Sequence, residues 1–197
     1  MKKVTLADIP IIREKPVETE KMKHLCEKYN GFMEISEKNN YGNVTINFSR
    51  IEPSKVSNNE YVDIGAYIIY KCLSALYISG KYNRKRIIAH GQLKDCGIKH
   101  FSLKFYKFVA HILETTLPER LEYWYIYGSS KFFRIIWNMM YKFIDPVTRE
   151  KFFLMKKKYI KQNRVPPTAM VEYILGNDFV YTEENGVVNG EYNQSSY

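Results

Sequence analysis

Four residues near the middle of the C-terminal half have the types and spacing of an anion site: Asp145, Pro146, Thr148 and Lys151. Asp145 followed by Pro146 predicts a helix start, because aspartate caps free backbone amides and proline fits the first helical turn. The positive end of such a helix favours an anion, and Lys151 would supply a cation nearby. Thr148 adds a hydroxyl that can donate or accept a hydrogen bond. A phosphate bearing a polyhydroxylated ring fits this set, although the same residues would also suit a solvated corner between a helix and a strand.

The segment 129–143, just before these residues, predicts a helix with an unusually wide apolar arc. Lys131, Arg134, Asn138 and Lys142 form its single polar stripe. The other large side chains are apolar: Phe132, Phe133, Ile135, Ile136, Trp137, Met139, Met140 and Phe143. Such a helix is either buried between two layers or apolar towards a ligand on one side and a membrane on the other.

Short motifs of nucleotide-binding, hydrolytic and metal sites are missing from the sequence. It contains no GxGxxG, complete Walker A, GxSxG or HExxH pattern. Gly128-Ser129-Ser130 lies between a predicted strand and a predicted helix, where it suits an ordinary helix cap better than a phosphate loop. The four histidines and three cysteines lack the spacing of metal ligands, so we expect no metal and no cofactor.

The length and composition suit one folded domain with an anionic partner. The chain has 197 residues, 45% of them hydrophobic, and a formal net charge of +9. Nucleic acid and an acidic membrane surface are the usual partners of such a charge. The aromatic residues lie mainly in apolar runs and not among the basic ones, so we expect no nucleic acid. The apolar window 61–80 contains Asp63 and Lys71, which favours a buried helix over a membrane span.

Periodicity predicts alternating strands and helices, and therefore an α/β fold with a largely parallel mixed sheet. Helices are expected at 17–30, 60–79, 102–116 and 129–143, with a last one opened by Pro166-Pro167 and ended near Gly176. Strands are expected at 32–36, 44–49, 85–91, 122–127 and 151–155. The Gly-, Asn- and Ser-rich tail 183–197 is expected to be disordered.

The segment 118–151 resembles the central signature of the CRAL-TRIO family, and in particular the phosphatidylinositol/phosphatidylcholine transfer proteins of the secretory pathway. The matching residues are Pro118-Glu119-Arg120, Asp145-Pro146-Val147-Thr148 and Lys151, and they match without a gap. Fainter similarity extends over 43–181. The resemblance implies one lipid-binding domain at 41–182, with 1–40 in place of the usual N-terminal helical bundle.

The resemblance also implies a carrier without enzymatic activity that binds one phospholipid, phosphatidylinositol, in an internal cavity and transfers or presents it between membranes. The expected headgroup residues are Thr148, Lys151, Asp145 and Glu119, with Arg120 pairing structurally with an acid. The helix 129–143 is expected to be a gate over the acyl cavity, with these residues facing it: Phe132, Phe133, Ile136, Trp137, Met140 and Phe143.

A departure from the family pattern at two positions bears on the expected lipid. The positions that hold the choline headgroup in such exchange proteins fall on Lys85 and Ile87, which argues against phosphatidylcholine. An alternative use of the same fold is an interaction or sensor module that regulates membrane traffic without net transfer. In either case we expect a cytoplasmic, peripherally membrane-associated monomer that contacts acidic membrane surfaces.

Overall fold

The computed structural model describes residues 5–128, 137, 144, 146–155, 179–184 and 187–192. The chain forms two units, Met1–Leu154 and Met155–Tyr197. Each unit is described by itself.

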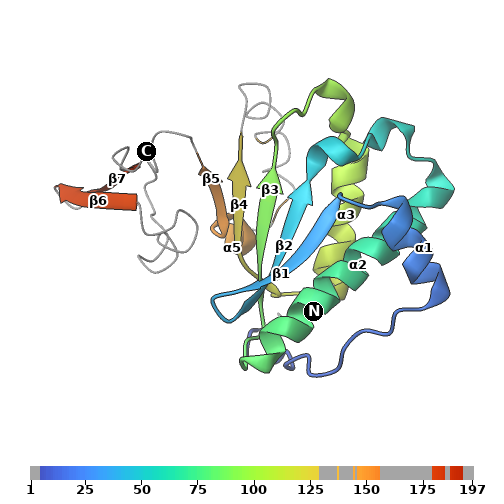
Figure 1. Ribbon diagram of the computed structural model, residues 1–197, viewed down its shortest axis with the longest axis horizontal. Helices are drawn as coiled ribbons and strands as arrows, with labels where there is room; N and C mark the ends of the chain where they lie inside the picture. The colour runs from blue at the N-terminus through green and yellow to red at the C-terminus, as the bar shows by residue number, and fades with distance from the viewer. Residues whose placement is uncertain are drawn as a thin grey trace. The chain divides into compact units, whose positions relative to one another are not determined.

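The first unit is built on a five-stranded sheet in the order β1-β2-β3-β4-β5 (Figure 1). Strand β1 (Met33–Lys38) pairs antiparallel with β2 (Tyr41–Asn47), and β2, β3 (Ile87–Gln92) and β4 (Leu121–Tyr127) are parallel. Strand β5 (Phe152–Met155) lies next to β4. Parallel neighbours need crossover helices, and two of these, α2 and α3, join β2 to β3 and β3 to β4.

Three helices cover one face of this sheet (Figure 1): α1 (Glu20–Lys28), α2 (Asn58–Lys81) and α3 (Leu103–Thr116). Side chains cap their N-termini, as the Thr19 and Ser102 hydroxyls accept hydrogen bonds from the first-turn amides of α1 and α3. A one-turn helix, α5 (Pro146–Arg149), precedes β5. Single turns of 3-10 helix occupy Phe48–Arg50, Pro53–Lys55 and Ile98–His100.

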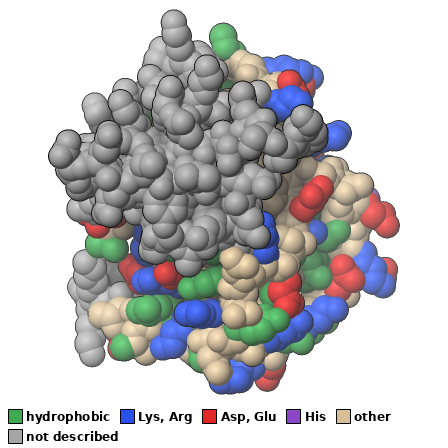
Figure 2. Space-filling view, turned by 60° about the vertical axis from the view of Figure 1, so that its left-hand side comes forward, with side chains coloured by type: hydrophobic (Ala, Val, Ile, Leu, Met, Phe, Trp, Pro, Cys, Tyr) green, Lys and Arg blue, Asp and Glu red, His purple; other side chains and the backbone are tan. Residues whose placement is uncertain are grey.

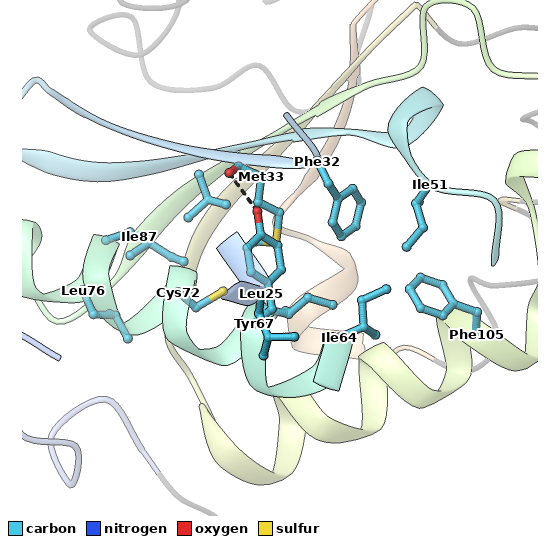
Figure 3. Close-up of a cluster of buried hydrophobic side chains, with 13 residues drawn as sticks. Leu25, Phe32, Met33, Ile51, Ile64, Tyr67, Cys72, Leu76, Ile87 and Phe105 are labelled. Carbon is cyan, nitrogen blue, oxygen red and sulfur yellow. Dashed lines mark hydrogen bonds between the residues drawn. The ribbon is translucent and has the colours of Figure 1, made fainter. Parts of the chain in front are cut away.

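Helix α2 lies at the centre of the core and contacts α1, α3 and strands β1 to β3. Ile64, Ala75 and Leu76 are essentially inaccessible to solvent. The Tyr67 hydroxyl points into the same cluster and donates to the Met33 carbonyl at 3.2 Å (Figure 3). The segment 60–81 is long and apolar enough to cross a membrane by length and composition alone. In this fold it forms a helix that packs on the sheet and belongs to the core, as the sequence predicts.

An extended strap, defined as residues 5–19, precedes α1 and is fastened to the first unit. Ile9 is 5% exposed, and Arg13 donates to the Asn83 side chain at 3.0 Å. Gly80, near the end of α2, allows the closest contact, because a Cβ there would lie 1.9 Å from the Ile12 carbonyl oxygen. The strap therefore depends on the absence of a side chain at residue 80.

The second unit contains an antiparallel hairpin of β6 (Phe179–Glu184) and β7 (Val187–Tyr192). Much of this hairpin lies in the tail for which the sequence analysis expects disorder. β-Branched and aromatic residues in the two segments favour strands, and Asn185-Gly186 is the dipeptide most typical of a two-residue hairpin turn. The Gly-, Asn- and Ser-rich composition of the tail as a whole favours disorder, whereas these local residues favour a hairpin.

The predicted fold class is confirmed: the first unit is an α/β domain with a mostly parallel sheet. Each predicted strand from 32 to 155 and each predicted helix from 17 to 116 has its counterpart in the structure. The predicted helix 129–143, apart from Trp137, and the predicted last helix near 166–176 lie outside the described residues.

Candidate functional site

A carboxylate lies between two cations where the turn before β4 approaches the residue before β5. The Oε2 atom of Glu119 is 3.1 Å from Lys151 Nζ and 3.1 Å from Arg86 Nη2. The side chains are only 20% exposed at Glu119, 20% at Arg86 and 12% at Lys151. Since water screens these charges poorly, the three side chains form a tightly coupled electrostatic group, which we call the Glu119 cluster.

Main-chain hydrogen bonds hold the members of the Glu119 cluster in place. The amide of Ile87 donates to the Arg120 carbonyl at 2.9 Å, which fixes the start of β3 beside the Glu119 turn. The Lys151 amide donates to the Thr148 carbonyl at 3.0 Å. The main-chain amide of Trp124 in β4 donates to the Lys151 carbonyl at 2.8 Å. Side chains far apart in the sequence are thereby brought to one end of the sheet.

The structure thus brings together three of the four predicted headgroup residues. Glu119 and Lys151 form an ion pair, and Thr148 is joined to Lys151 through the main chain. The short helix predicted from Pro146 is present as α5. Asp145 lies outside the described residues.

Arg86 is a member of the cluster that the sequence analysis missed. Its Nε donates to the Glu119 carbonyl at 3.0 Å, and its Nη1 is 3.3 Å from a carboxylate oxygen of Glu122. The only sequence signal is a basic pair, Lys85-Arg86, at the start of a predicted strand. The register of β3 on β4, which places Ile87 opposite Leu121, decides where Arg86 lies, and sequence alone does not give that register.

Arg120 differs from the expectation that it pairs with an acid. It is 8% exposed, and its Nη1 donates to the carbonyls of Pro10 and Lys85 at 2.7 and 3.1 Å. No carboxylate is among its partners in the part of the chain that the structure describes. Burial lowers the pKa of Arg120 from its ordinary value. Main-chain carbonyls satisfy the guanidinium, so Arg120 ties the strap to the edge of the Glu119 cluster.

The strap also contacts Lys85, one of the two residues from which the sequence analysis argues against phosphatidylcholine. Lys85 Nζ donates to the Leu6 carbonyl at 3.0 Å. The side chain of Asp8 lies close enough for the charge of Lys85 to contribute to lowering the Asp8 pKa, after the hydrogen bonds from Thr5. The strap therefore contacts Lys85 through a main-chain carbonyl and through the charge of Asp8.

An apolar surface extends from the core towards the sheet edge near the Glu119 cluster. Val44, Ala89 and Trp124 pair across neighbouring strands and so share the sheet face that α2 covers. The Trp124 ring stacks on Phe152 with centroids 4.9 Å apart. Trp137, the one described residue of the predicted gate, packs on Phe152 at 4.9 Å. The other predicted gate residues lie outside the described residues: Phe132, Phe133, Ile136, Met140 and Phe143.

The opposite sheet face carries a half-buried histidine. The two ring nitrogens of His90 lie 3.0 Å from the Asn43 side-chain oxygen and 3.2 Å from the Tyr127 hydroxyl. Burial lowers the pKa of His90 to about 4, so the ring is neutral at physiological pH. The contacts of His90 are those of a structural histidine. Over the described ranges, no three His, Cys, Asp or Glu side chains are grouped as metal ligands.

Comparison with known proteins agrees with this architecture. The family model for the CRAL/TRIO domain matches residues 27–174, which is most of the chain. The chain belongs to the CRAL/TRIO family. Members of this family are lipid-binding carriers, so the predicted family and its general lipid-binding character are both supported.

A solved structure shares the CRAL/TRIO fold of this chain. The crystal structure of Sfh5 superimposes with a TM-score of 0.56 at 15% sequence identity, covering 64% of this chain. The match covers 48% of the Sfh5 chain, so this chain spans about half of the length of that structure. Comparison with curated protein sequences finds no match.

Proposed function

We propose that this CRAL/TRIO protein binds one phospholipid, phosphatidylinositol, in an internal apolar cavity and transfers or presents it between membranes. The observation that carries the proposal is the partly buried Glu119–Lys151 pair, 3.1 Å long, beside α5 and close to the end of an apolar sheet face. Lys151 provides a cation for the lipid phosphate, and Glu119 and Thr148 provide acceptors and a donor for inositol hydroxyls.

The apolar face suits the other half of such a ligand. A diacyl lipid has on the order of 30 methylenes at ~0.8 kcal/mol each, so exposing its chains to water costs about 24 kcal/mol. This exceeds the stability of a typical domain, so a carrier must enclose the chains in transit. The aromatic residues Trp124, Phe152 and Trp137 supply part of such an enclosure, and the segment 129–143 is proposed as its gate.

Membrane contact follows from the charge of the chain. Charged side chains of both signs are interspersed on the coloured part of the face in Figure 2. The net charge of +9 and the basic run Lys156-Lys157-Lys158 would attract acidic cytoplasmic leaflets at ~1 kcal/mol per charge near the surface. We therefore place the protein at the cytoplasmic surface of a membrane, as a peripheral and monomeric carrier.

A vesicle assay tests transfer directly. Wild-type protein should move labelled phosphatidylinositol from donor to acceptor vesicles, and Thr148→Ala should slow this transfer while keeping the melting temperature. If the wild type binds phosphatidylinositol but moves none between vesicles, the protein is a lipid sensor or interaction module and the transfer proposal is wrong.

A further inference from the structure

Arg86 holds the Glu119 turn through several contacts, and a headgroup function of Glu119 and Lys151 does not by itself call for them. Its three nitrogens reach the Glu119 carbonyl at 3.0 Å, the Glu119 carboxylate at 3.1 Å and the Glu122 carboxylate at 3.3 Å. Arginine is suited to this task because its donors are fixed in one planar fork. Arg86 therefore holds both the main chain and the side chain of Glu119.

Glu119 needs such support because its backbone is in an unfavourable conformation. Its φ is +57°, in the left-handed region that costs a non-glycine residue roughly 1–2 kcal/mol. The hydrogen bond from Arg86 Nε to the Glu119 carbonyl fixes one end of the residue, and the ion pair fixes the other. Arg86 thus directs the Glu119 carboxylate towards Lys151.

The two cations meet the same oxygen atom. Arg86 Nη2 and Lys151 Nζ are both 3.1 Å from Glu119 Oε2, so the two nitrogens lie within two hydrogen-bond lengths of each other. Arg86 forms a second ion pair, with Glu122, whereas Lys151 forms its ion pair with Glu119. If Lys151 turns from Glu119 to a lipid phosphate, Glu119 keeps one counter-ion, Arg86, which it shares with Glu122. Without Arg86, the same movement would leave a largely buried carboxylate without a counter-ion, which is costly.

We propose that Arg86 is a positioning and specificity-determining residue of the headgroup site, which remains as a counter-ion of Glu119 when Lys151 is released to an anionic headgroup. This inference rests on the proposed function. It also predicts a preference against choline, because a quaternary ammonium at this site would lie near the cations Arg86 and Lys151, and like charges in a poorly hydrated site repel. Inositol brings no cation and meets no such repulsion.

The experiment compares Arg86→Gln with Arg84→Gln after incubation with vesicles of equal phosphatidylinositol and phosphatidylcholine content, with bound lipid read by native mass spectrometry. Arg84 is a matched control, because it is exposed, lies two residues away and packs over the Tyr41 ring. Arg86→Gln should lower the bound phosphatidylinositol-to-phosphatidylcholine ratio by about tenfold, the size expected for losing one charge-assisted interaction. Arg84→Gln should keep the wild-type ratio.

A second substitution separates a counter-ion role from simple structural damage. Arg86→Lys keeps the positive charge and loses the planar fork. If Arg86 acts as a counter-ion, Arg86→Lys should keep most of the wild-type ratio, whereas a merely structural role of the fork should lower its ratio as far as that of Arg86→Gln. If Arg86→Gln does not fold, the comparison of Arg86→Lys with the wild type still tests the counter-ion argument.

The outcomes of this experiment distinguish the inference from the proposed function. A wild-type protein that binds neither phospholipid overturns the proposed function itself. A wild type that binds phosphatidylinositol, with Arg86→Gln and Arg84→Gln giving equal ratios, overturns the role of Arg86 alone. An Arg86→Lys ratio about tenfold below that of the wild type overturns the counter-ion argument.

Discussion

Replacing Lys151 with methionine should separate binding from folding. Methionine keeps the length and apolar stem of lysine but removes the cation that faces Glu119 at 3.1 Å. Breaking a buried ion pair usually costs about 3–5 kcal/mol, because one charge is left without a partner. Here Glu119 keeps a second counter-ion, because Arg86 Nη2 lies 3.1 Å from its carboxylate. We therefore expect a loss of only about 1 kcal/mol, equivalent to about 2–4 °C in melting temperature for a chain of this size.

The effect on lipid transfer should be much larger than the effect on stability. A hydrogen bond to a charged group contributes about 1.5–3 kcal/mol, and each 1.4 kcal/mol corresponds to a tenfold change in affinity. Lys151→Met should therefore reduce phosphatidylinositol transfer between vesicles by at least about tenfold. The initial rate at limiting protein concentration is the quantity to compare.

Lys23→Met is the matched control for this prediction. Lys23 also pairs with a glutamate, at 2.7 Å from Glu20, but both side chains are exposed and lie on α1. Both variants lose one positive charge, so a nonspecific effect of charge on vesicle attraction would be equal in the two. Equal transfer rates for Lys151→Met and Lys23→Met would refute the headgroup role of Lys151.

Three further predictions concern the framework around the site. Arg120→Met leaves the carbonyls of Pro10 and Lys85 without their donor, and should lower the free energy of unfolding in urea by about 2 kcal/mol. Gly80→Val should displace the strap, because a Cβ there would lie 1.9 Å from the Ile12 carbonyl oxygen; limited proteolysis should then cut within residues 5–19 sooner. Burial lowers the pKa of His90 from 6.5 to about 4, so the unfolded state binds the proton more readily below pH 6.5. Stability should fall by about 3 kcal/mol between pH 7 and pH 4, and His90→Gln should remove this part of the pH dependence. Unchanged urea midpoints, cleavage rates or pH profiles, respectively, would contradict these predictions.

The sequence predicted the elements well because their apolar periods are strong. Val44, Ile46 and Phe48 alternate with polar residues, and the first two lie in β2 on the sheet face that packs on α2. The apolar window 61–80 became the core helix α2. Such patterns report which face is buried, which is a local property of each element.

The sequence could not predict how elements far apart combine. Arg86 reaches Glu119 only because β3 and β4 pair in one register, and Arg120 donates to the Pro10 carbonyl of the strap, 110 residues away. Neither contact leaves a pattern in the local sequence. The Glu119–Lys151 pair was predicted as two headgroup residues because family resemblance carries information about the fold that residue types alone do not.

Native mass spectrometry of the purified 197-residue chain is the most direct test of the proposed function. We predict a species heavier than the 23.4 kDa polypeptide by the mass of one phospholipid, identified as phosphatidylinositol after extraction. Lys151→Met should lack most of this species while Lys23→Met keeps it. A wild-type chain that stays lipid-free after incubation with phosphatidylinositol vesicles, or that binds only lipids without a phosphate, would contradict the proposal.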